Sequence, residues 1–377
     1  MPIALYDVPL LDHHCHSLLR FDRPVTAEDL RGCFTEGRDP GLLARHLPHS
    51  LFYRRAIRDL AQFLGCDPTE EAILVRRAGE APDAYARRLF EDARFEGLLV
   101  DFGFRTDVHF DHAGLAAVVP CPVAPVLRLE ALAGALVAET DTFERMVEVY
   151  GEQVNTARAR GAVALKSVVA YRSGLTVAPP DRQTAKAAFD AVRRTGPAGP
   201  VRLTQKPLLD YLLWLGLEAA AAQDLPMQIH TGFGDRDLDL RLANPLHLRP
   251  ILETPALSHI PIVLLHCYPY VREAAYLAHV YDQVYVDLSL TLPFAADGAL
   301  AVEEALGLAP TTKVLVATDA FTLPELFWVG AHHARDAVAR ALQRLSRAGY
   351  LRGREAEGVG RQLLNENARR IYPVRRG

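Results

Sequence analysis

Leu10-Leu11-Asp12-His13-His14-Cys15-His16 is an apolar run that leads directly into a His-x-His pair. Side chains two residues apart on an extended segment point to the same side, so His14 and His16 can bind one metal ion. Far along the chain, another apolar run over residues 313–318 is followed by Asp319. Short apolar runs that end near a metal-binding residue are the repeated feature of this sequence, and they decide the fold prediction.

Eight apolar runs, rich in Val, Ile and Leu, alternate with helical patterns. Strands with little polar alternation, separated by helices, are typical of a parallel sheet that is buried on both faces. Eight such units predict an α/β fold, a closed (β/α)8 TIM barrel. The alternative is an open doubly wound sheet, which is disfavoured because no glycine-rich dinucleotide-binding turn follows the first run. The predicted strands are residues 7–12, 97–102, 123–129, 163–169, 226–230, 262–266, 284–288 and 313–318.

The segment between the first two predicted strands is too long for a single crossover helix. Residues 23–95 show the pattern of three or four helices, for example Ser50–Leu64, which Gly65 would end. We predict a helical insertion after strand one, beside the C-terminal mouth of the barrel. Such an insertion would form a lid, a subunit contact or extra packing.

Composition and charge indicate a globular protein and argue against a nucleic-acid-binding or membrane-spanning one. The 377 residues are 50% hydrophobic and 23% charged, as in a globular enzyme with a large core. A net charge of −4 gives no basic footprint for nucleic acid, and no apolar run approaches the roughly 20 residues of a membrane helix. The five cysteines are odd in number and widely spread, and the start lacks a signal-peptide pattern. We expect a cytoplasmic single-domain protein over residues 1–377 that binds a small molecule; a homo-oligomer is allowed but not specified.

The ends of the predicted strands carry residue types that bind divalent metals. Because these ends meet at one rim of a barrel, we expect their side chains to converge. Imidazole and carboxylate suit Zn²⁺, with Mn²⁺, Fe²⁺ and Ni²⁺ as alternatives. A single histidine at a strand end is more often structural, but five strand ends are less easily explained by chance. The candidates are His14, His16, Lys166, His230, His266 and Asp319.

Lys166 stands alone inside an apolar run. Burying an ammonium group without a partner is costly, so the residue needs a structural or chemical explanation. The structural explanation is a salt bridge to Glu130 or Asp101. A second structural pair, between Arg128 and Glu130, is expected on the third strand.

Together these positions resemble the amidohydrolase superfamily of metal-dependent hydrolases. The superfamily pattern is His-x-His after strand one, Lys after strand four, His after strands five and six, and Asp after strand eight. Longer stretches are similar to one branch, the amidohydrolase-type domain that precedes a glutamine synthetase domain in some plant nodulins and fungal regulators. These stretches are Leu165–Ser167, Tyr171–Leu175, His230–Asp235, Leu265–Pro269 and Asn365–Arg370.

The resemblance implies roles for the metal ligands. In two-metal members, Lys166 would carry a carbamate that bridges the ions, which would also remove its buried positive charge. In one-metal members the lysine is not needed, and His266 becomes a catalytic or orienting group. We favour two zinc ions and a carboxylated lysine. The first ion would be held by His14, His16 and Asp319, and the second by His230 and His266; one ion would use His14, His16, His230 and Asp319.

The implied function is hydrolysis of an amide, another C–N bond or a lactone in a small polar molecule by a metal-activated water. Asp319 would accept the proton of that water and pass it to the leaving group. Tyr171 and Arg172 follow strand four, and Asp235 follows strand five. We expect these three to contact substrate, since a guanidinium can clamp a carboxylate and a carboxylate can pair with an amine.

Two other functions are compatible with the same pattern. One is a single-metal decarboxylase of a small carboxylic acid, because relatives with one metal catalyse that reaction. Lys166 argues against it, since the one-metal relatives lack this lysine. The other is a non-enzymatic role in assembly or regulation, which the complete ligand set disfavours.

Overall fold

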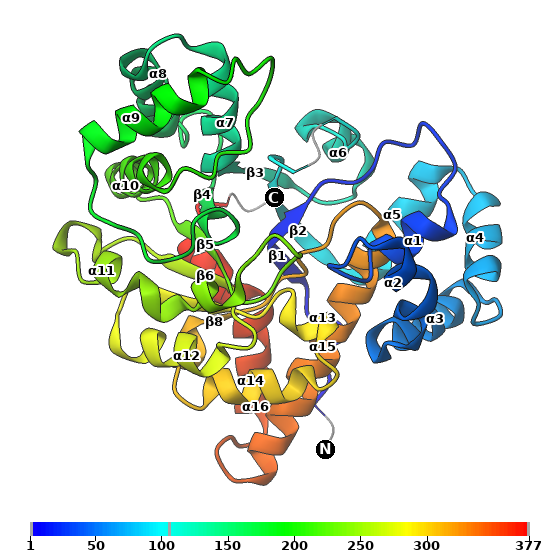
Figure 1. Ribbon diagram of the computed structural model, residues 1–377. Helices are drawn as coiled ribbons and strands as arrows, with labels where there is room; N and C mark the ends of the chain where they lie inside the picture. Colours follow the sequence, from blue (N-terminus) through cyan, green and yellow to red (C-terminus); the bar gives the residue numbers. More distant parts are fainter. Residues whose placement is uncertain (1–2, 105–106, 375–377) are drawn as a thin grey trace.

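The computed structural model describes residues 3–104 and 107–374; residues 1–2, 105–106 and 375–377 of the predicted domain lie outside it. Its strands form one parallel sheet in consecutive order, and Figure 1 shows them at the centre with helices around them. The strands are β1 (Leu10–His16), β2 (Phe95–Asp101), β3 (Val123–Arg128), β4 (Ala164–Ser167), β5 (Met227–Thr231), β6 (Ile262–His266), β7 (Val284–Asp287) and β8 (Val314–Leu315).

Backbone hydrogen bonds join the segment after β8 to β1 and so close the sheet. The Asp319 N–H donates to the carbonyl of His14 at 3.0 Å, and the His16 N–H donates to the carbonyl of Ala320 at 2.8 Å. The predicted (β/α)8 barrel is therefore confirmed. Since the same bonds bring Asp319 beside His14 and His16, closing the barrel also assembles the first part of the site.

The boundaries of the first and last strands differ from the prediction. The first strand is predicted to end at residue 12, but β1 continues to His16, which pairs with Asp101 of β2. The polar residues at the end of β1 are therefore part of the sheet and not of a loop that follows it. β8 stops at Leu315, and three residues later the Asp12 carboxylate accepts the backbone N–H of Thr318 at 2.9 Å. Between Asp12 and Cys15, β1 advances three residues while β2 advances two, which is the signature of a β-bulge.

The helices between β1 and β2 fill the region that the sequence assigns to the insertion. In α3 the Ser50 side chain accepts the N–H of Tyr53, and Gly65 ends the helix at φ 65°, the left-handed conformation that glycine allows. Figure 1 shows these helices together on one side of the barrel. They are α1 (Ala27–Gly32), α2 (Pro40–Arg45), α3 (Leu51–Leu64), α4 (Glu70–Ala78) and α5 (Pro82–Ala93).

The remaining helices surround the strands or follow them. None of the helices in the described ranges is long and apolar enough to cross a bilayer. The α-helices are α6 (His112–Val118), α7 (Leu129–Glu139), α8 (Phe143–Asn155), α9 (Arg182–Arg193), α10 (Lys206–Gln223), α11 (Arg249–Leu252), α12 (Val271–Val280), α13 (Thr291–Phe294), α14 (Gly298–Leu306), α15 (Pro324–Arg347), α16 (Arg354–Arg361) and α17 (Asn367–Ile371). Single turns are η1 (Leu47–His49), η2 (Val169–Tyr171), η3 (Leu240–Ala243), η4 (Pro245–Leu248), η5 (Pro255–Leu257), η6 (Thr311–Lys313) and the π-turn η7 (Gln362–Glu366).

Polar contacts fasten the insertion helices to α15. Arg77 of α4 forms an ion pair with the buried carboxylate of Glu325. The buried His333 ring is joined to the Asp59 carboxylate of α3 at 2.9 Å. Because α15 follows β8 directly, these contacts fix the insertion beside the strand ends that carry the site.

The inside of the barrel holds a small apolar cluster, separate from the large core between the sheet and the helices. It gathers residues of several strands with Ala368 and Tyr372 from the C-terminal helix region. The ring of Tyr372 lies against His13, with centroids 5.6 Å apart. The C-terminal segment therefore fills the interior beneath the polar residues of β1.

Candidate metal centre and substrate pocket

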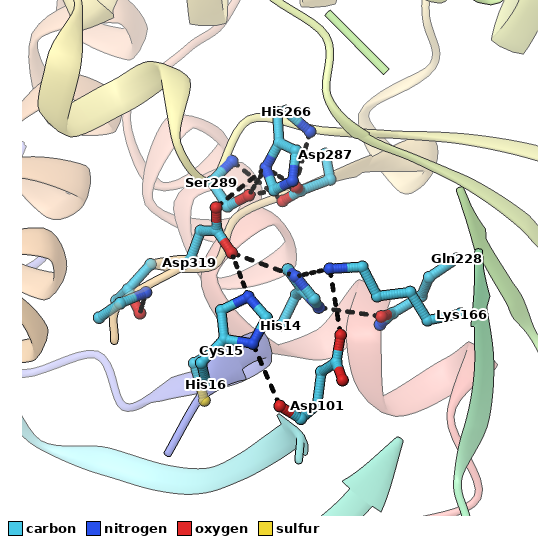
Figure 2. Close-up of polar contacts among 12 residues, drawn as sticks. His14, Cys15, His16, Asp101, Lys166, Gln228, His266, Asp287, Ser289 and Asp319 are labelled. Carbon is cyan, nitrogen blue, oxygen red and sulfur yellow. Dashed lines mark hydrogen bonds and ion pairs between the residues drawn. The ribbon is translucent and has the colours of Figure 1, made fainter. Parts of the chain in front are cut away.

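The residues that the sequence singles out as metal ligands come together at the C-terminal ends of the strands. Figure 2 shows side chains from β1, β4 and β6 pointing toward Asp319. The ring centroids of His14 and His266 lie 5.6 Å apart, and those of His230 and His266 lie 4.5 Å apart. All of these rings are buried. We call His14, His16, His230, His266 and Asp319 the rim cluster.

Three members of the rim cluster are close enough to share one ion. Ligand atoms of His14, His16 and Asp319 all lie within 4.8 Å of one another. The Oδ1 atom of Asp319 is 3.1 Å from Nε2 of His14 and 3.4 Å from Nε2 of His16. Both histidines of the His-x-His pair thus turn the same nitrogen toward one carboxylate oxygen, as their spacing predicts.

Hydrogen bonds beneath the rim cluster set the tautomer of His14. The Gln228 amide nitrogen donates to the carbonyl of His13 at 2.8 Å and lies 2.9 Å from the Tyr372 hydroxyl, so its oxygen faces His14. That oxygen is 3.0 Å from Nδ1 of His14 and accepts its proton. Nε2 of His14 therefore carries a lone pair into the site, the arrangement found in histidines that bind metals.

His16 and His266 are oriented in the same way. Nδ1 of His16 donates to the carbonyl of Asp101 at 3.1 Å. Nδ1 of His266 is 2.7 Å from the Ser289 hydroxyl, which itself donates to Asp287 and so accepts from the ring. Each ring leaves Nε2 unprotonated, and a lone pair on Nε2 is what a divalent metal requires.

The electron-rich interior of the rim cluster fits a cation. Nε2 of His230, Nε2 of His266 and Oδ1 of Asp319 are buried and have no hydrogen-bond partner among the described residues. Buried polar atoms are normally paired, because leaving one unpaired costs free energy. Imidazole lone pairs turned toward a carboxylate oxygen repel it unless a positive charge lies between them, and the donor set suits zinc and similar ions.

Burial favours the neutral form of three imidazoles of the rim cluster, those of His14, His230 and His266. Burial is the main cause that lowers the pKa of His14 to about 3, and the positive charge of Lys166 contributes in the same direction. Burial is also the main reason that the pKa values of His230 and His266 lie below their ordinary range. Neutral imidazole is the form that can bind a metal at neutral pH.

The backbone at two rim residues adopts the left-handed conformation. His266 has φ 70° and Asp319 has φ 52°. This region is uncommon for residues other than glycine, and such conformations gather at functional sites, where the surrounding structure holds them. Nothing in the local sequence marks this conformation, so only the structure reveals it.

Lys166 lies inside the site and interacts with both a base and an acid. Its Nζ atom is 2.7 Å from Nε2 of His14 and 3.4 Å from the Asp101 carboxylate. Burial lowers the pKa of Lys166, and the nearby Asp101 opposes that effect. The salt-bridge partner is thus Asp101 and not Glu130, which instead accepts hydrogen bonds from the Ser167 hydroxyl and the Val168 N–H.

The expected pair between Arg128 and Glu130 is wrong. Arg128 donates to the Asp101 carboxylate at 2.7 Å. Arg128 ends β3, whereas Glu130 begins α7, and that helix turns the carboxylate toward β4. Asp101 therefore receives both Arg128 and Lys166, which keeps its pKa below the ordinary range although burial acts to raise it.

A cavity of about 300 Å³ opens onto the rim cluster. It is lined by all three predicted substrate contacts, Tyr171, Arg172 and Asp235. The Tyr171 ring packs on His230 with centroids 4.3 Å apart. A Cβ atom on Gly234 would lie 1.9 Å from the Tyr171 hydroxyl, so this glycine leaves the space that the tyrosine occupies.

Sequence reasoning missed four lining residues that come from loops and not from strand ends. Glu36 and Arg38 belong to the insertion, between α1 and α2, and Arg202 precedes α10. Phe321 follows Asp319 by two residues and stacks against the Arg38 guanidinium at 5.5 Å. Their only signal in the sequence is charge or aromaticity in a loop, which many surface residues share.

A family model described as amidohydrolase matches residues 104–374. The chain belongs to the amidohydrolase family. Proteins of this family generally use divalent metals, in keeping with the donor set of the rim cluster.

Individual relatives show the same likeness. This amidohydrolase is 29% identical to Protein fluG of Emericella nidulans over 97% of its own length and 46% of that protein, so it spans about half the length of this curated relative. A crystal structure from Lactobacillus casei, described as a candidate metal-dependent hydrolase, is 34% identical, with a TM-score of 0.88 over 97% of this chain and 96% of the other. Uronate isomerase of Thermotoga maritima, 14% identical with a TM-score of 0.66 over 97% and 95% of the two chains, shares the fold.

Proposed function

We propose that this amidohydrolase is a metal-dependent hydrolase that cleaves an amide, another C–N bond or a lactone in a small polar molecule. The observation that carries the proposal is the rim cluster, where imidazole lone pairs and a buried carboxylate oxygen face one another without a proton between them. The pocket above it is small and polar. Its volume of about 300 Å³ lies at the lower end of the range for small-molecule sites.

The proposed metal ligands are those of the rim cluster together with Lys166. His14, His16 and Asp319 would hold a first ion, with zinc as the best match to these donors. A carbamate on Lys166, formed when its amine adds to CO₂ and loses a proton, would supply an anionic oxygen ligand for a second ion beside His230 and His266. With one ion, His14, His16, His230 and Asp319 form the set. A bound divalent cation lowers the pKa of water and polarises a carbonyl group.

Asp319 is the proposed acid–base group. Its carboxylate lies where the rim cluster meets the pocket, and its Oδ1 atom receives no hydrogen bond within the described ranges. It would accept the proton of the attacking water and donate it to the leaving nitrogen or oxygen. His266, whose Nδ1 lies 3.7 Å from the other oxygen of Asp319, would bind metal or orient this carboxylate.

Tyr171, Arg172 and Asp235 are the proposed substrate contacts. The Tyr171 ring packs on His230 and lines the pocket. The Arg172 guanidinium makes no hydrogen bond or ion pair with any described residue, although it lines the pocket. A free guanidinium beside a hydrolytic centre suits a carboxylate on the substrate.

A metal and substrate survey tests the proposed function. Purified protein would be assayed for metal content, then loaded with zinc or manganese and incubated with amides, lactones and carboxylic acids. We expect bound metal and hydrolysis of a C–N or lactone bond that a chelator abolishes. Full occupancy with no hydrolysis of any member would contradict the proposal. Release of CO₂ from a carboxylic acid with one bound ion would instead support the decarboxylase alternative.

A further inference from the structure

The pocket above the rim cluster contains charges of both signs that do not neutralise one another. Arg172 is one free charge. Glu36, which also lines the pocket, makes no hydrogen bond or ion pair in the part of the chain that the structure describes. The carboxylate of Asp235 accepts only the N–H of Asp237, two residues away. None of these three charged groups of one small cavity forms an ion pair with another described residue.

The other cations of the pocket are already engaged. Arg128 is paired with Asp101 at 2.6 Å, and Arg202 with Asp237 at 3.1 Å. Arg38 donates to the carbonyl of Gly32. Arg128 and Arg202 are therefore less available to a ligand, and among the described lining arginines Arg172 is the one whose guanidinium makes neither an ion pair nor a hydrogen bond.

The loop that carries Glu36 is anchored on both sides. Cys33 and Phe34 are buried in the core, each with 1% of its surface exposed. The Thr35 hydroxyl accepts the N–H of Gly37 at 3.0 Å, and Arg38 donates to Gly32 at 3.0 Å. Glu36 therefore lines the pocket from an anchored loop of the insertion and not from a free surface loop.

Glu36 lines the same pocket as two other acidic residues, Asp235 and Asp319. Burial is the main cause that raises the pKa of Glu36 to about 7; the negative charges of Asp319 and Asp235 add to the rise, and the positive charge of Arg38 opposes it. Burial also raises the pKa of Tyr171, with further contributions from Glu36, Asp319 and Asp235. Tyr171 and the three carboxyl groups line one pocket, and a positive charge bound there would relieve the repulsion between the carboxylates.

We infer that the substrate is a zwitterion of the amino-acid type, with its ammonium group held by Glu36 and Asp235 and its carboxylate held by Arg172. This assignment rests on the proposed hydrolytic function and makes Glu36 a specificity-determining residue contributed by the helical insertion. The hydrolysed C–N bond then belongs to the part of the molecule that faces Asp319. Charge-assisted hydrogen bonds to both ends would select such a molecule over neutral amides of equal size.

A binding experiment tests the assignment without requiring turnover. L-asparagine and L-glutamine are the simplest probes, because each has an ammonium, a carboxylate and a carboxamide. Calorimetry on the zinc-loaded full chain would compare them with their N-acetyl and α-methyl ester derivatives. We expect at least one amino acid to bind about tenfold or more tightly than either derivative. No preference for either free amino acid would overturn the inference.

Variants assign each charge to its residue. Glu36→Gln should reduce the preference over the N-acetyl derivative to about threefold or less, while preserving the preference over the ester; Arg172→Gln should do the reverse. Glu28→Gln, an exposed change in α1 of the same insertion, should preserve both preferences. An unchanged N-acetyl preference in Glu36→Gln would overturn the role of Glu36.

The inference and the proposed function fail in different ways. Binding of a zwitterion without hydrolysis of any amide, lactone or ester would contradict the hydrolytic function and keep the zwitterion assignment. Hydrolysis of neutral or purely anionic compounds, with no binding of the free amino acids, would keep the function and overturn the assignment.

Discussion

Two neighbouring regions of the barrel interior hold buried imidazoles beside carboxylates, yet they are built in opposite ways. In the inner network, formed by His13, Gln228, Asp287 and Tyr372, both ring nitrogens of His13 have partners: Asp287 at 3.0 Å and the Tyr372 hydroxyl at 3.2 Å. In the rim cluster the protein backbone or a neutral side chain accepts from Nδ1 of His14, His16 and His266, and Nε2 of each ring faces the site, where that of His266 has no partner among the described residues and that of His14 meets the Lys166 amine. His13 and His14 are adjacent in sequence and equally buried.

This difference shows how the hydrogen-bond partners of a buried histidine distinguish a structural residue from a metal ligand in this fold. A fully partnered imidazole stabilises the barrel, whereas an imidazole with one buried lone pair is incomplete without a cation. The inner network also orients two rings of the rim cluster. The Gln228 amide oxygen accepts a hydrogen bond from His14. Asp287 accepts a hydrogen bond from the Ser289 hydroxyl, which in turn accepts one from His266. The predictions below test this division, starting with the largest expected effect.

Replacing Asp319 by Asn should remove the acid–base group while keeping its shape. We expect turnover to fall by about 10²- to 10⁴-fold, the range typical of general acid–base residues. Steady-state kinetics together with metal analysis would measure this, and a variant that keeps its metal shows that the loss is chemical. Activity within tenfold of the wild type would remove Asp319 from its proposed role.

Exchanging one histidine in each region should separate stability from metal binding. His13→Leu leaves Asp287 without its ring partner, so we expect the free energy of unfolding of metal-free protein to fall by about 3–5 kcal/mol. His16→Leu removes one hydrogen bond to a backbone carbonyl and should cost only about 1 kcal/mol. Urea unfolding in a chelator measures both.

The same two variants should behave oppositely when zinc is added. At about 100 times the dissociation constant, a bound ion stabilises a protein by about 2.7 kcal/mol. We expect His13→Leu to retain this gain and His16→Leu to lose it. If zinc stabilised both variants equally, the proposed difference in role between the inner network and the rim cluster would be wrong.

Gln228 links the two regions and should affect metal affinity without touching the ion. Gln228→Met removes the acceptor that fixes His14, and changes of this kind typically cost about 10- to 100-fold in metal affinity. Competition with a chromophoric chelator measures the affinity. Gln153→Met on α8, outside the inner network, is the control and should bind zinc like the wild type. If Gln228→Met also retains wild-type affinity, the tautomer of His14 does not depend on this contact.

The smallest expected effect is on the free energy of unfolding, from replacing Asp29, a hydrogen-bonded carboxylate of the insertion. Asp29 accepts hydrogen bonds from Arg23 and Thr26, and the Arg23 contact is the main reason that its pKa lies below the ordinary value. Its stabilisation is therefore present above the unfolded pKa of about 3.9 and is lost as the pH falls through the lower folded value. Asp29→Asn should cost about 1 kcal/mol at pH 7 and less at pH 3.

Urea unfolding at the two pH values measures the Asp29 effect. Asp7→Asn is the control, because the Asp7 side chain is largely exposed and its pair with Arg94 lies at the surface. Surface pairs of this kind contribute little to stability. A cost for Asp29→Asn that stays the same or grows toward pH 3 would contradict the assigned direction of its pKa.

The barrel follows from the sequence because its signal is repeated and local. Predicted strand 262–266 matches β6, and 284–288 differs from β7 by one residue. The first strand was harder to predict, because Asp12 and His14 look like the end of an apolar run but lie inside the barrel. The bulge between Asp12 and Cys15 comes from pairing with β2 and has no local signal.

The site was predictable where it depends on residue type and strand position, and not where it depends on partners. His230 and Lys166 were visible as polar residues at apolar runs, and the structure brings them into one pocket; their metal-binding roles stay predictions. The partner of Arg128 was not visible, because Asp101 and Glu130 are equally acidic and only the start of α7 turns Glu130 away. Glu36 lies far from any strand end, so its place above the site is a long-range contact.

By itself, the sequence determined the alternation of buried strands and helices, the barrel that they close, and the imidazole, amine and carboxylate chemistry gathered at one rim, because apolar periodicity and residue type are local properties. Only the tertiary structure decided which histidine nitrogens lack a partner, which carboxylates are paired, and that an insertion loop brings Glu36 into the pocket that Arg172 also lines. Those outcomes depend on distances between residues far apart in the chain, and a hydrogen bond or an unmatched charge exists only once such residues are brought together.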